Sequence, residues 1–280
     1  MYNVPIKILF PAVVALMLVS CGGNSSQQQA QAVVNQATDA LNSGDFNRAL
    51  LLADSVKTAW PEAIDARREA LHISVRATEG LTLRKLESTD SLLTALSVTA
   101  DSLKNFVKLV SNPVENYYIA AGDNPGDVYA SSGLRARLSL EGDFYLIATL
   151  RPGGVKATSV MVSDGAATAA TATVAYDGER NDRSDGMERI TFIAAECDSV
   201  GRFIFEHAGV PLKLTFSGSS TKSVTLTPES AKRIAVLYDY ASTLRRARVA
   251  SVERERLSRA LDMARAQAAR TYVVKDSVID

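Results

Sequence analysis

Residues 62–110 read EAIDARREALHISVRATEGLTLRKLESTDSLLTALSVTADSLKNFVKLV and contain no proline and a single glycine, Gly80. Apolar and small side chains recur along them every three to four residues, which is the spacing of one helix face. We therefore expect a helix from Glu62 to about Val110, about 70 Å long. Its stripe is heptad-like with a polar middle and consists of Ile64, Leu71, Val75, Thr78, Thr82, Lys85, Thr89, Leu92, Leu96, Thr99, Leu103, Phe106 and Val110.

A stripe of this length needs a partner helix, because knobs-into-holes packing buries it only against a second stripe. The partner is predicted at residues 228–270, after Thr227-Pro228-Glu229, which supplies a capping side chain and then a proline for the first helical position. The two helices should pair antiparallel. Residues 271–280 are expected to form a tail. The apolar positions of the partner are Ile234, Leu237, Ala241, Leu244, Leu257, Leu261, Ala264 and Ala268.

Residues 114–227, after the stop at Asn112-Pro113, change to alternating apolar and polar side chains with glycine-bearing turns. The alternation over 134–140 and 144–150 around Glu141-Gly142-Asp143 predicts a hairpin. Because few helical patterns separate the strands, the sheet should be antiparallel. The predicted fold class is α+β, a long antiparallel helical or coiled-coil stalk with an inserted β-sandwich-like module. Further strands are expected at 159–162, 171–176, 189–194, 211–216 and 223–227, with a turn at Gly218-Ser219-Ser220.

Residues 22–113 form the predicted N-terminal helical segment, which starts with a short helix at 27–43. Gly44-Asp45-Phe46, Ala49 and Pro61 then resemble the second half of a tetratricopeptide repeat, and Pro61 suits the first turn of the long helix. A peptide groove of that kind needs about three repeats. The one hairpin expected here therefore implies packing rather than peptide capture.

Residues 1–21 have the form of a lipoprotein signal peptide, with Lys7, an apolar run at 8–19, and the lipobox Leu18-Val19-Ser20-Cys21. The run is shorter than the roughly 20 residues that a membrane span needs, and Pro11 interrupts it. We expect cleavage before Cys21 and lipid attachment, including palmitate, at Cys21. Since Gly22 is not an aspartate, the predicted location is the cell outer membrane, and the absence of an acidic run after Cys21 favours its periplasmic face.

The charge balance gives no indication of a nucleic-acid partner. The 280 residues carry 31 Lys and Arg against 31 Asp and Glu, so neither nucleic acid nor long-range electrostatic steering is indicated. With Cys21 acylated, Cys197 has no partner for an intrachain disulfide. Cys197 continues an apolar stretch, and free cysteines are among the most buried residues. We expect it to be buried, with a reactive thiol as the alternative.

Several residues fit catalytic or metal patterns only in part. Residues 219–222, SSTK, match a serine-x-x-lysine pattern, but the companion motifs of penicillin-recognising enzymes are absent. Residues 177–186 are rich in calcium-type ligands, yet an EF-hand spacing fails, so a solvated loop is expected there and at 123–127. His72 and His207 have no second zinc ligand at a suitable spacing. No catalytic residue, metal ligand or cofactor is therefore predicted, and the ligand-binding residues remain unknown.

The predicted helix at 228–270 is rich in arginine, which suggests either phosphate binding or ion pairs with the facing helix. We favour ion pairs, because Glu253 and Glu255 lie among the arginines and carboxylates occur on the other helix. The arginines are Arg245, Arg246, Arg248, Arg254, Arg256, Arg259, Arg265 and Arg270. The carboxylates are Glu62, Glu69, Glu79, Glu87 and Asp90.

Residues 189–195, 212–218 and 230–238 resemble an uncharacterised family of small lipoproteins of Bacteroidota, which combine a helical segment, a β module and a C-terminal helix. The resemblance implies localisation and architecture and transfers no functional residues. We expect a membrane-anchored, non-enzymatic cell-envelope lipoprotein whose stalk presents the β module to a protein or glycan partner. The alternative is an envelope hydrolase with a pocket in the β-module loops; a transport adaptor would have its helices inserted into β structure, the reverse order.

Overall fold

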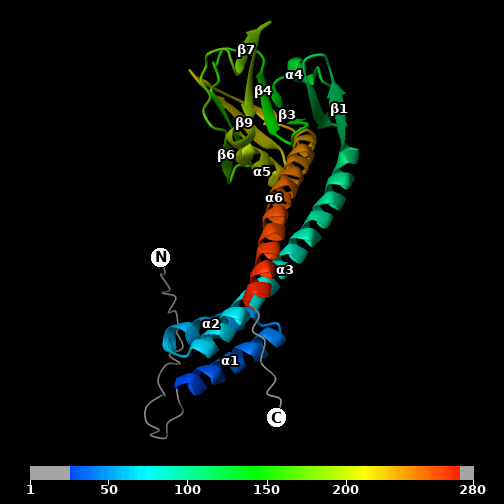
Figure 1. The fold of residues 1–280 in the computed structure, drawn as a ribbon. Coiled ribbons are helices and arrows are strands. Elements are labelled where there is room, and N and C mark those ends of the chain that lie inside the picture. Colours follow the sequence, from blue (N-terminus) through cyan, green and yellow to red (C-terminus); the bar gives the residue numbers. More distant parts are fainter. Residues whose placement is uncertain (1–25, 272–280) are drawn as a thin grey trace, which may run out of the picture. The chain divides into compact units, whose positions relative to one another are not determined.

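The computed structural model describes residues 26–271 and has the predicted α+β class (Figure 1). It divides into two compact units. The described part of unit 1 is residues 26–84 and 259–271, and unit 2 is residues 85–258. Two long helices, α3 (Ile64–Leu103) and α6 (Pro228–Thr271), each contribute to both units.

Unit 1 is helical and packs through small side chains. Helices α1 (Ser26–Asn42) and α2 (Phe46–Ala59) form the predicted hairpin, and Asp45 caps α2 by accepting the Arg48 backbone N–H at 3.1 Å. Small side chains let the three helices approach closely. The core consists of Ala30, Val34, Ala37, Ala40, Ala49, Ala53, Val56, Ala63, Ala66, Ala70, Ile73 and Ala77.

The start of α3 differs from the prediction. Pro61 lies in a turn before the helix, in which the backbone N–H groups of Ala63 and Ile64 donate to the carbonyls of Trp60 and Glu62. The expected stripe is also partly wrong, because Ile64 is 63% exposed and Leu71 51% exposed. The face that packs on α1 and α2 instead consists of Ala66, Ala70, Ile73 and Ala77, and Ala63 just before the helix joins the same core.

The end of α3 also differs. The helix stops at Leu103, and a short 3-10 turn, η1 (Lys104–Phe106), leads into strand β1 (Val107–Ser111), where the sequence predicted helix to Val110. Strand β2 (Asn116–Ala120) pairs with β1 and was not expected. The sheet therefore begins at Val107 rather than after Pro113.

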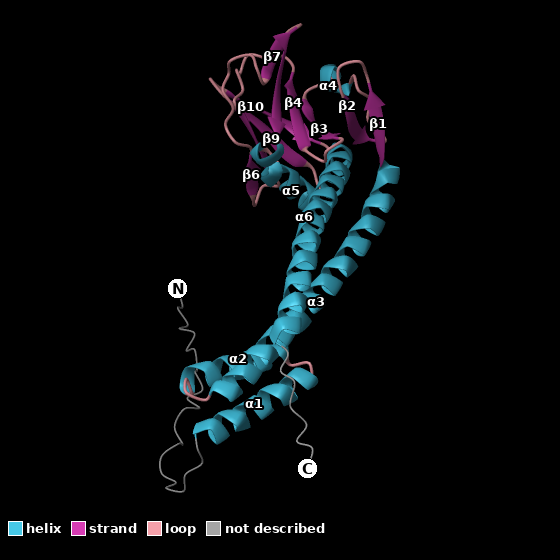
Figure 2. Cartoon of the chain, in the orientation of Figure 1, coloured by secondary structure: helices cyan, strands magenta, loops and turns pink. Residues whose placement is uncertain are grey.

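Unit 2 contains two antiparallel sheets (Figure 2). The six-stranded sheet has the order β1-β2-β3-β4-β8-β7, and the four-stranded sheet β10-β9-β5-β6. The other strands of the first are β3 (Gly133–Ser139), β4 (Phe144–Leu150), β7 (Asn181–Ser184) and β8 (Met187–Ile193). Those of the second are β5 (Ser159–Ser163), β6 (Thr168–Ala170), β9 (Leu212–Ser217) and β10 (Thr221–Leu226).

The two sheets share one hydrophobic core, in which the predicted alternation is confirmed. Leu134, Leu146 and Phe192 of the larger sheet and Leu214 and Phe216 of the smaller are each at most 1% exposed. Helix α5 (Asp198–His207) and the first turns of α6 cover the same core. Short elements α4 (Asp127–Ala130) and η2 (Ala194–Glu196) complete the unit.

One expected strand of unit 2 is absent. Residues 171–176 form no strand, although the backbone N–H of Val174 donates to the Thr158 carbonyl at 2.8 Å. His207, expected near the end of a connection between strands, is the last residue of helix α5, which lies between β8 and β9. The predicted start of α6 is confirmed, since Pro228 is its first residue and the Ser230 N–H donates to Thr227 Oγ1 at 3.2 Å.

Helices α3 and α6 run antiparallel within each unit. In unit 2, Arg254 Nε lies 2.6 Å from Asp90 Oδ1. In unit 1, Arg265 contacts Glu79 and Thr271 contacts His72, so later residues of α6 meet earlier residues of α3. The buried side chains near the end of α6, Leu257, Leu261, Ala264 and Ala268, follow the predicted spacing.

Candidate functional site

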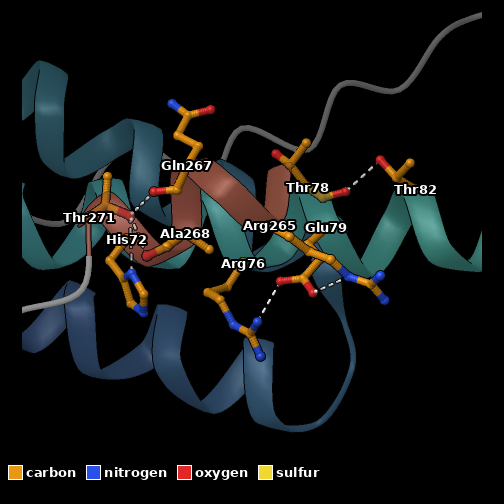
Figure 3. Close-up of polar contacts among 9 residues, drawn as sticks. All are labelled: His72, Arg76, Thr78, Glu79, Thr82, Arg265, Gln267, Ala268 and Thr271. Atoms are coloured by element: carbon orange, nitrogen blue, oxygen red, sulfur yellow. Dashed lines mark hydrogen bonds and ion pairs between the residues drawn. The ribbon is translucent and has the colours of Figure 1, made fainter. Parts of the chain in front are cut away.

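A polar cluster joins α3 to α6 in unit 1 (Figure 3). The Glu79 carboxylate accepts hydrogen bonds from two guanidinium groups, from Arg76 Nη1 at 2.5 Å and from Arg265 Nε at 3.4 Å. His72 Nδ1 lies 3.1 Å from Thr271 Oγ1, which itself donates to the Gln267 carbonyl at 3.0 Å. These contacts connect a helix near the start of the described chain with its last helix.

The electrostatics of this cluster favour a neutral imidazole. Desolvation and then the charge of Arg76 lower the pKa of His72, and the backbone of Ala268 opposes them. A hollow of about 500 Å³ lies over His72, Arg76, Glu79, Arg265, Ala268 and Ala269. Since Glu79 is held by both arginines, it is an ion-pair partner rather than a poised general base. The cluster therefore links α3 and α6 through hydrogen bonds and ion pairs.

A second hollow, of about 610 Å³, lies on the surface of α2 and α3 in unit 1. Apolar Ile64 and Leu71 line it together with the cations Lys57, Arg67 and Arg68. The remaining lining residues are Ala53, Asp54, Ala70 and Ser74. This combination of exposed apolar and basic side chains was not recognised in the sequence, because the stripe of α3 was assigned to its partner helix.

The serine-x-x-lysine pattern does not form a catalytic pair. Ser219 lies in the predicted turn, and its Oγ donates to the Val155 carbonyl at 2.8 Å. Lys222 Nζ donates to the Pro152 carbonyl at 3.1 Å. Both groups thus bond to the loop before β5, and the motif holds that loop against the β9–β10 hairpin.

Residues 177–186, expected to form a solvated loop, include strand β7 at Asn181–Ser184, and their ligand-type side chains bond to nearby parts of the chain. Asn181 Oδ1 accepts the Gly178 N–H at 2.8 Å, its Nδ2 donates to the Ala175 carbonyl at 2.7 Å, and Asp182 pairs with Arg189 at 3.0 Å. These bonds build the turn into β7. Within residues 26–271, no group of three or more His, Cys, Asp or Glu side chains is placed to hold a metal ion.

The loop at residues 123–127 is similarly engaged. Asp123 is 5% exposed and forms an ion pair with Arg233 of α6 at 3.0 Å. The Asn124 N–H donates to Asp127 Oδ2 at 2.8 Å. The adjoining hollow has a volume of only about 10 Å³, which is at the lower limit for one water molecule.

Cys197 is fully buried, as predicted. Its Sγ lies 3.7 Å from the Phe144 carbonyl and 3.6 Å from the Phe192 carbonyl. Burial raises the pKa of the thiol to about 12. Because the thiolate is the reactive species, this environment makes the thiol inert.

Two networks in unit 2 had no sequence signal. Buried Glu188 of β8 accepts backbone N–H groups from Gly154 and Lys156, each at 3.0 Å, and from Ala157. Asp198, the first residue of α5, accepts from Arg245 Nη2 at 2.8 Å. Each joins segments that are distant in the sequence, so neither could be read from local spacing.

The Asp198 network is electrostatically well satisfied. Burial alone would raise the pKa of its carboxyl, but hydrogen bonding and charge from Arg245, together with Arg202 and Tyr238, lower that pKa below its usual value. Arg202 lies one turn further along α5, at 3.3 Å. The network fastens α5 to α6 over the shared core.

The arginines of α6 have mixed roles, so the predicted interhelical ion pairs account for part of them. Arg254 and Arg265 pair with Asp90 and Glu79 of α3. Arg256 pairs within its own helix with Glu253, and Arg245 pairs with α5. Of the other predicted carboxylate partners, Glu62 accepts a hydrogen bond from Ser26 and Glu69 accepts one from Gln31, both residues of α1.

The fold defines an α+β protein with a helical unit and a two-sheet unit. No protein family, curated protein or solved structure matches the chain. Cys21, the predicted lipid attachment site, lies outside the described residues. Among the helices of the described residues, none has both the length and the apolar character needed to cross a membrane.

Proposed function

We propose that this chain is a lipid-anchored, non-enzymatic lipoprotein of the cell envelope, attached through Cys21 to the periplasmic face of the outer membrane. The observation that carries the anchor is the lipobox Leu18-Val19-Ser20-Cys21 after an apolar run. Helix α1 is described from Ser26, five positions after the lipobox cysteine. A lipobox followed closely by a folded domain is the arrangement expected for an acylated, otherwise water-exposed protein.

A binding role is supported by the contacts of the side chains that could otherwise act as nucleophiles, acids or bases. Ser219, Lys222 and Glu188 all bond to backbone groups of the chain itself, and the Cys197 thiol is buried. These residues stabilise loops and core. We therefore favour a scaffold or binding module over the alternative of an envelope hydrolase, for which these contacts offer no activated nucleophile.

The binding surface that we assign is the β1–β2 hairpin of unit 2. Strand β1 is at one end of the six-stranded sheet, where a further strand can add by main-chain hydrogen bonds. Leu109 on β1 is 53% exposed, and Val114 in the turn is 93% exposed. Exposed aliphatic side chains beside an end strand suit a protein better than a glycan, so the proposed partner is an envelope protein.

Two measurements test the proposal. Metabolic labelling with an alkynyl fatty acid should label the wild-type chain and leave Cys21→Ser unlabelled; equal labelling of both would contradict the anchor. A photo-crosslinking residue at Leu109 or Val114 should then trap one recurrent protein in intact cells. The matched control is the same residue at Glu206, which is exposed on α5 of the same unit. Identical crosslinks from all three positions would contradict the binding surface.

A further inference from the structure

One exposed face of α3 in unit 1 carries an amphipathic stripe that the core does not use. Ile64, Arg67, Arg68 and Leu71 are all exposed and lie at i, i+3, i+4 and i+7, the spacing of a single helix face. Ala66 points instead into the core formed with α1 and α2. The two large apolar side chains of the stripe are therefore not required for packing within unit 1.

This stripe lies close to the start of the described chain. The Ser26 hydroxyl of α1 donates to the Glu62 carboxylate, two residues before Ile64. Only four residues separate Ser26 from Cys21, and the five residue-to-residue steps between them span at most about 18 Å. The stripe itself covers about 10 Å of helix. A lipid on Cys21 therefore holds Ile64 and its neighbours within reach of the bilayer surface.

The chemistry of the stripe suits a phospholipid headgroup layer. The hollow along it is lined by three cations, Lys57, Arg67 and Arg68, against one anion, Asp54. Asp65 offsets part of this charge by pairing with Arg68 at 3.7 Å. Aliphatic side chains bury their surface at the interface, while arginine and lysine form ion pairs with lipid phosphates. Apolar contact and a modest positive field thus act together.

We propose that this face, Ile64, Arg67, Arg68 and Leu71 with Lys57 beside it, is a membrane-contact surface that rests on the phospholipid headgroups of the anchoring bilayer. The inference rests on the proposed acylation of Cys21, which determines the surface that the face meets. This contact surface would be a second point of attachment besides the lipid on Cys21, so unit 1 would lie against the bilayer. A second copy of the chain or an acidic peptide would be a different occupant.

The test uses the leaderless chain with Cys21→Ser, so that no lipid assists binding. This protein is mixed with vesicles of phosphatidylethanolamine and phosphatidylglycerol, and the fraction that floats with them is measured. We expect flotation of the otherwise unaltered chain, and a decrease of at least about fivefold when Ile64→Ser and Leu71→Ser are combined. Combining Arg67→Gln with Arg68→Gln should also weaken vesicle binding. The binding that remains should depend less on the salt concentration than that of the parent chain.

The matched control is the pair Val249→Ser and Val252→Ser, which removes two aliphatic side chains, 71% and 64% exposed, from the surface of α6 in unit 2. This pair should float like the parent. Circular dichroism checks that every variant keeps its helix content. Loss of flotation in the stripe variant alone, with unchanged circular dichroism, supports the proposal.

Three results would overturn it: no flotation of the parent, equal flotation of parent and stripe variant, or self-association that the stripe substitutions abolish in the absence of vesicle binding. Fatty-acid labelling separates this failure from that of the proposed function. A labelled Cys21 with no vesicle binding by the unacylated chain removes the contact surface and leaves the anchor standing. An unlabelled Cys21 removes the anchor, whatever the vesicles show.

Discussion

The ring of Tyr238 occupies the space beside Gly201 so closely that a Cβ atom on residue 201 would lie 2.5 Å from Tyr238 Cδ2. Phe144 Cε1 would be 2.8 Å from the same atom, and the two rings themselves meet edge to face with centroids 5.4 Å apart. Helix α5 therefore approaches α6 and β4 at a distance that only glycine permits.

Gly201→Ala should destabilise unit 2, because the added methyl group must displace two packed rings in a fully buried position. We expect the free energy of unfolding to fall by about 1–3 kcal/mol in urea denaturation, even though alanine is the better helix former. Gly209→Ala is the control, since a Cβ there has no neighbour within 4 Å. Equal effects of the two substitutions would contradict the packing argument.

Glu188→Gln should loosen the loop before β5. Both carboxylate oxygens of Glu188 accept backbone N–H groups, and an amide would place its own donor against one of them. The expected loss is about 1–3 kcal/mol of unfolding free energy. Glu206→Gln, on the exposed surface of α5, should change stability by less than about 0.5 kcal/mol. If both variants unfold at the wild-type urea concentration, the carboxylate does not hold this loop.

The pKa of His72 should depend on the charge of Arg76. Its pKa is below the usual 6.5, through desolvation first and then Arg76. The unfolded chain therefore takes up this proton more readily, so the contribution of neutral His72 to stability is complete above about pH 6.5 and is lost as pH falls through the folded pKa. Arg76→Gln should move the NMR titration of His72 upward, while Arg68→Gln should not. A titration that Arg76→Gln leaves in place would argue against the charge effect.

Cys197 should resist thiol reagents in the folded chain. Its pKa is raised to about 12 by burial, so at pH 8 almost no thiolate is present, and access is closed as well. In the Cys21→Ser chain, reaction with a disulfide reagent should start only when denaturant unfolds unit 2. Ser220→Cys, at the exposed β9–β10 turn, should react at once under the same conditions. Rapid labelling of Cys197 in native buffer would show that the core opens readily.

The parts of the fold that were predicted correctly are those with a complete local signal. Thr227 and Pro228 specify a helix start through one hydroxyl and one missing N–H, and both act within a single turn. The β3–β4 hairpin combines strict alternation with a glycine turn at Gly142, whose φ is +91°. Such features form through local interactions, so they can be predicted without knowing which elements pack against them.

The errors fall where tertiary contacts decide. Val107, Leu109 and Val110 fit a helical stripe as well as a strand, and their pairing with β2 selects the strand. Helix α5 contains Phe203 and Ile204, which suit a strand by propensity, yet with Val200 they are buried as one helix face. The spacing of those three residues was a usable signal that the surrounding β pattern obscured.

For the candidate sites, the sequence identified residue types but not their partners. Ser219 was correctly placed at a turn, whereas Lys222 lies in strand β10, and only the fold shows that both bond to the loop before β5. The exposed stripe on α3 was visible as Ile64 and Leu71 but was assigned to the core. Whether an apolar helix face is buried depends on the neighbouring helix, which local periodicity cannot provide.

The division of the chain also affects the order in which its two units can fold. Unit 2 is one continuous stretch, residues 85–258, whereas unit 1 needs both residues 26–84 and residues 259–271. During synthesis from the N-terminus, unit 2 can therefore fold before the end of α6 is made. The packing of unit 1 is completed only when residues 259–271 are added. A truncation between residues 259 and 264 should leave unit 2 intact and expose the parts of α3 that Arg265 and Thr271 contact, so an incomplete chain would present a surface that the complete chain covers.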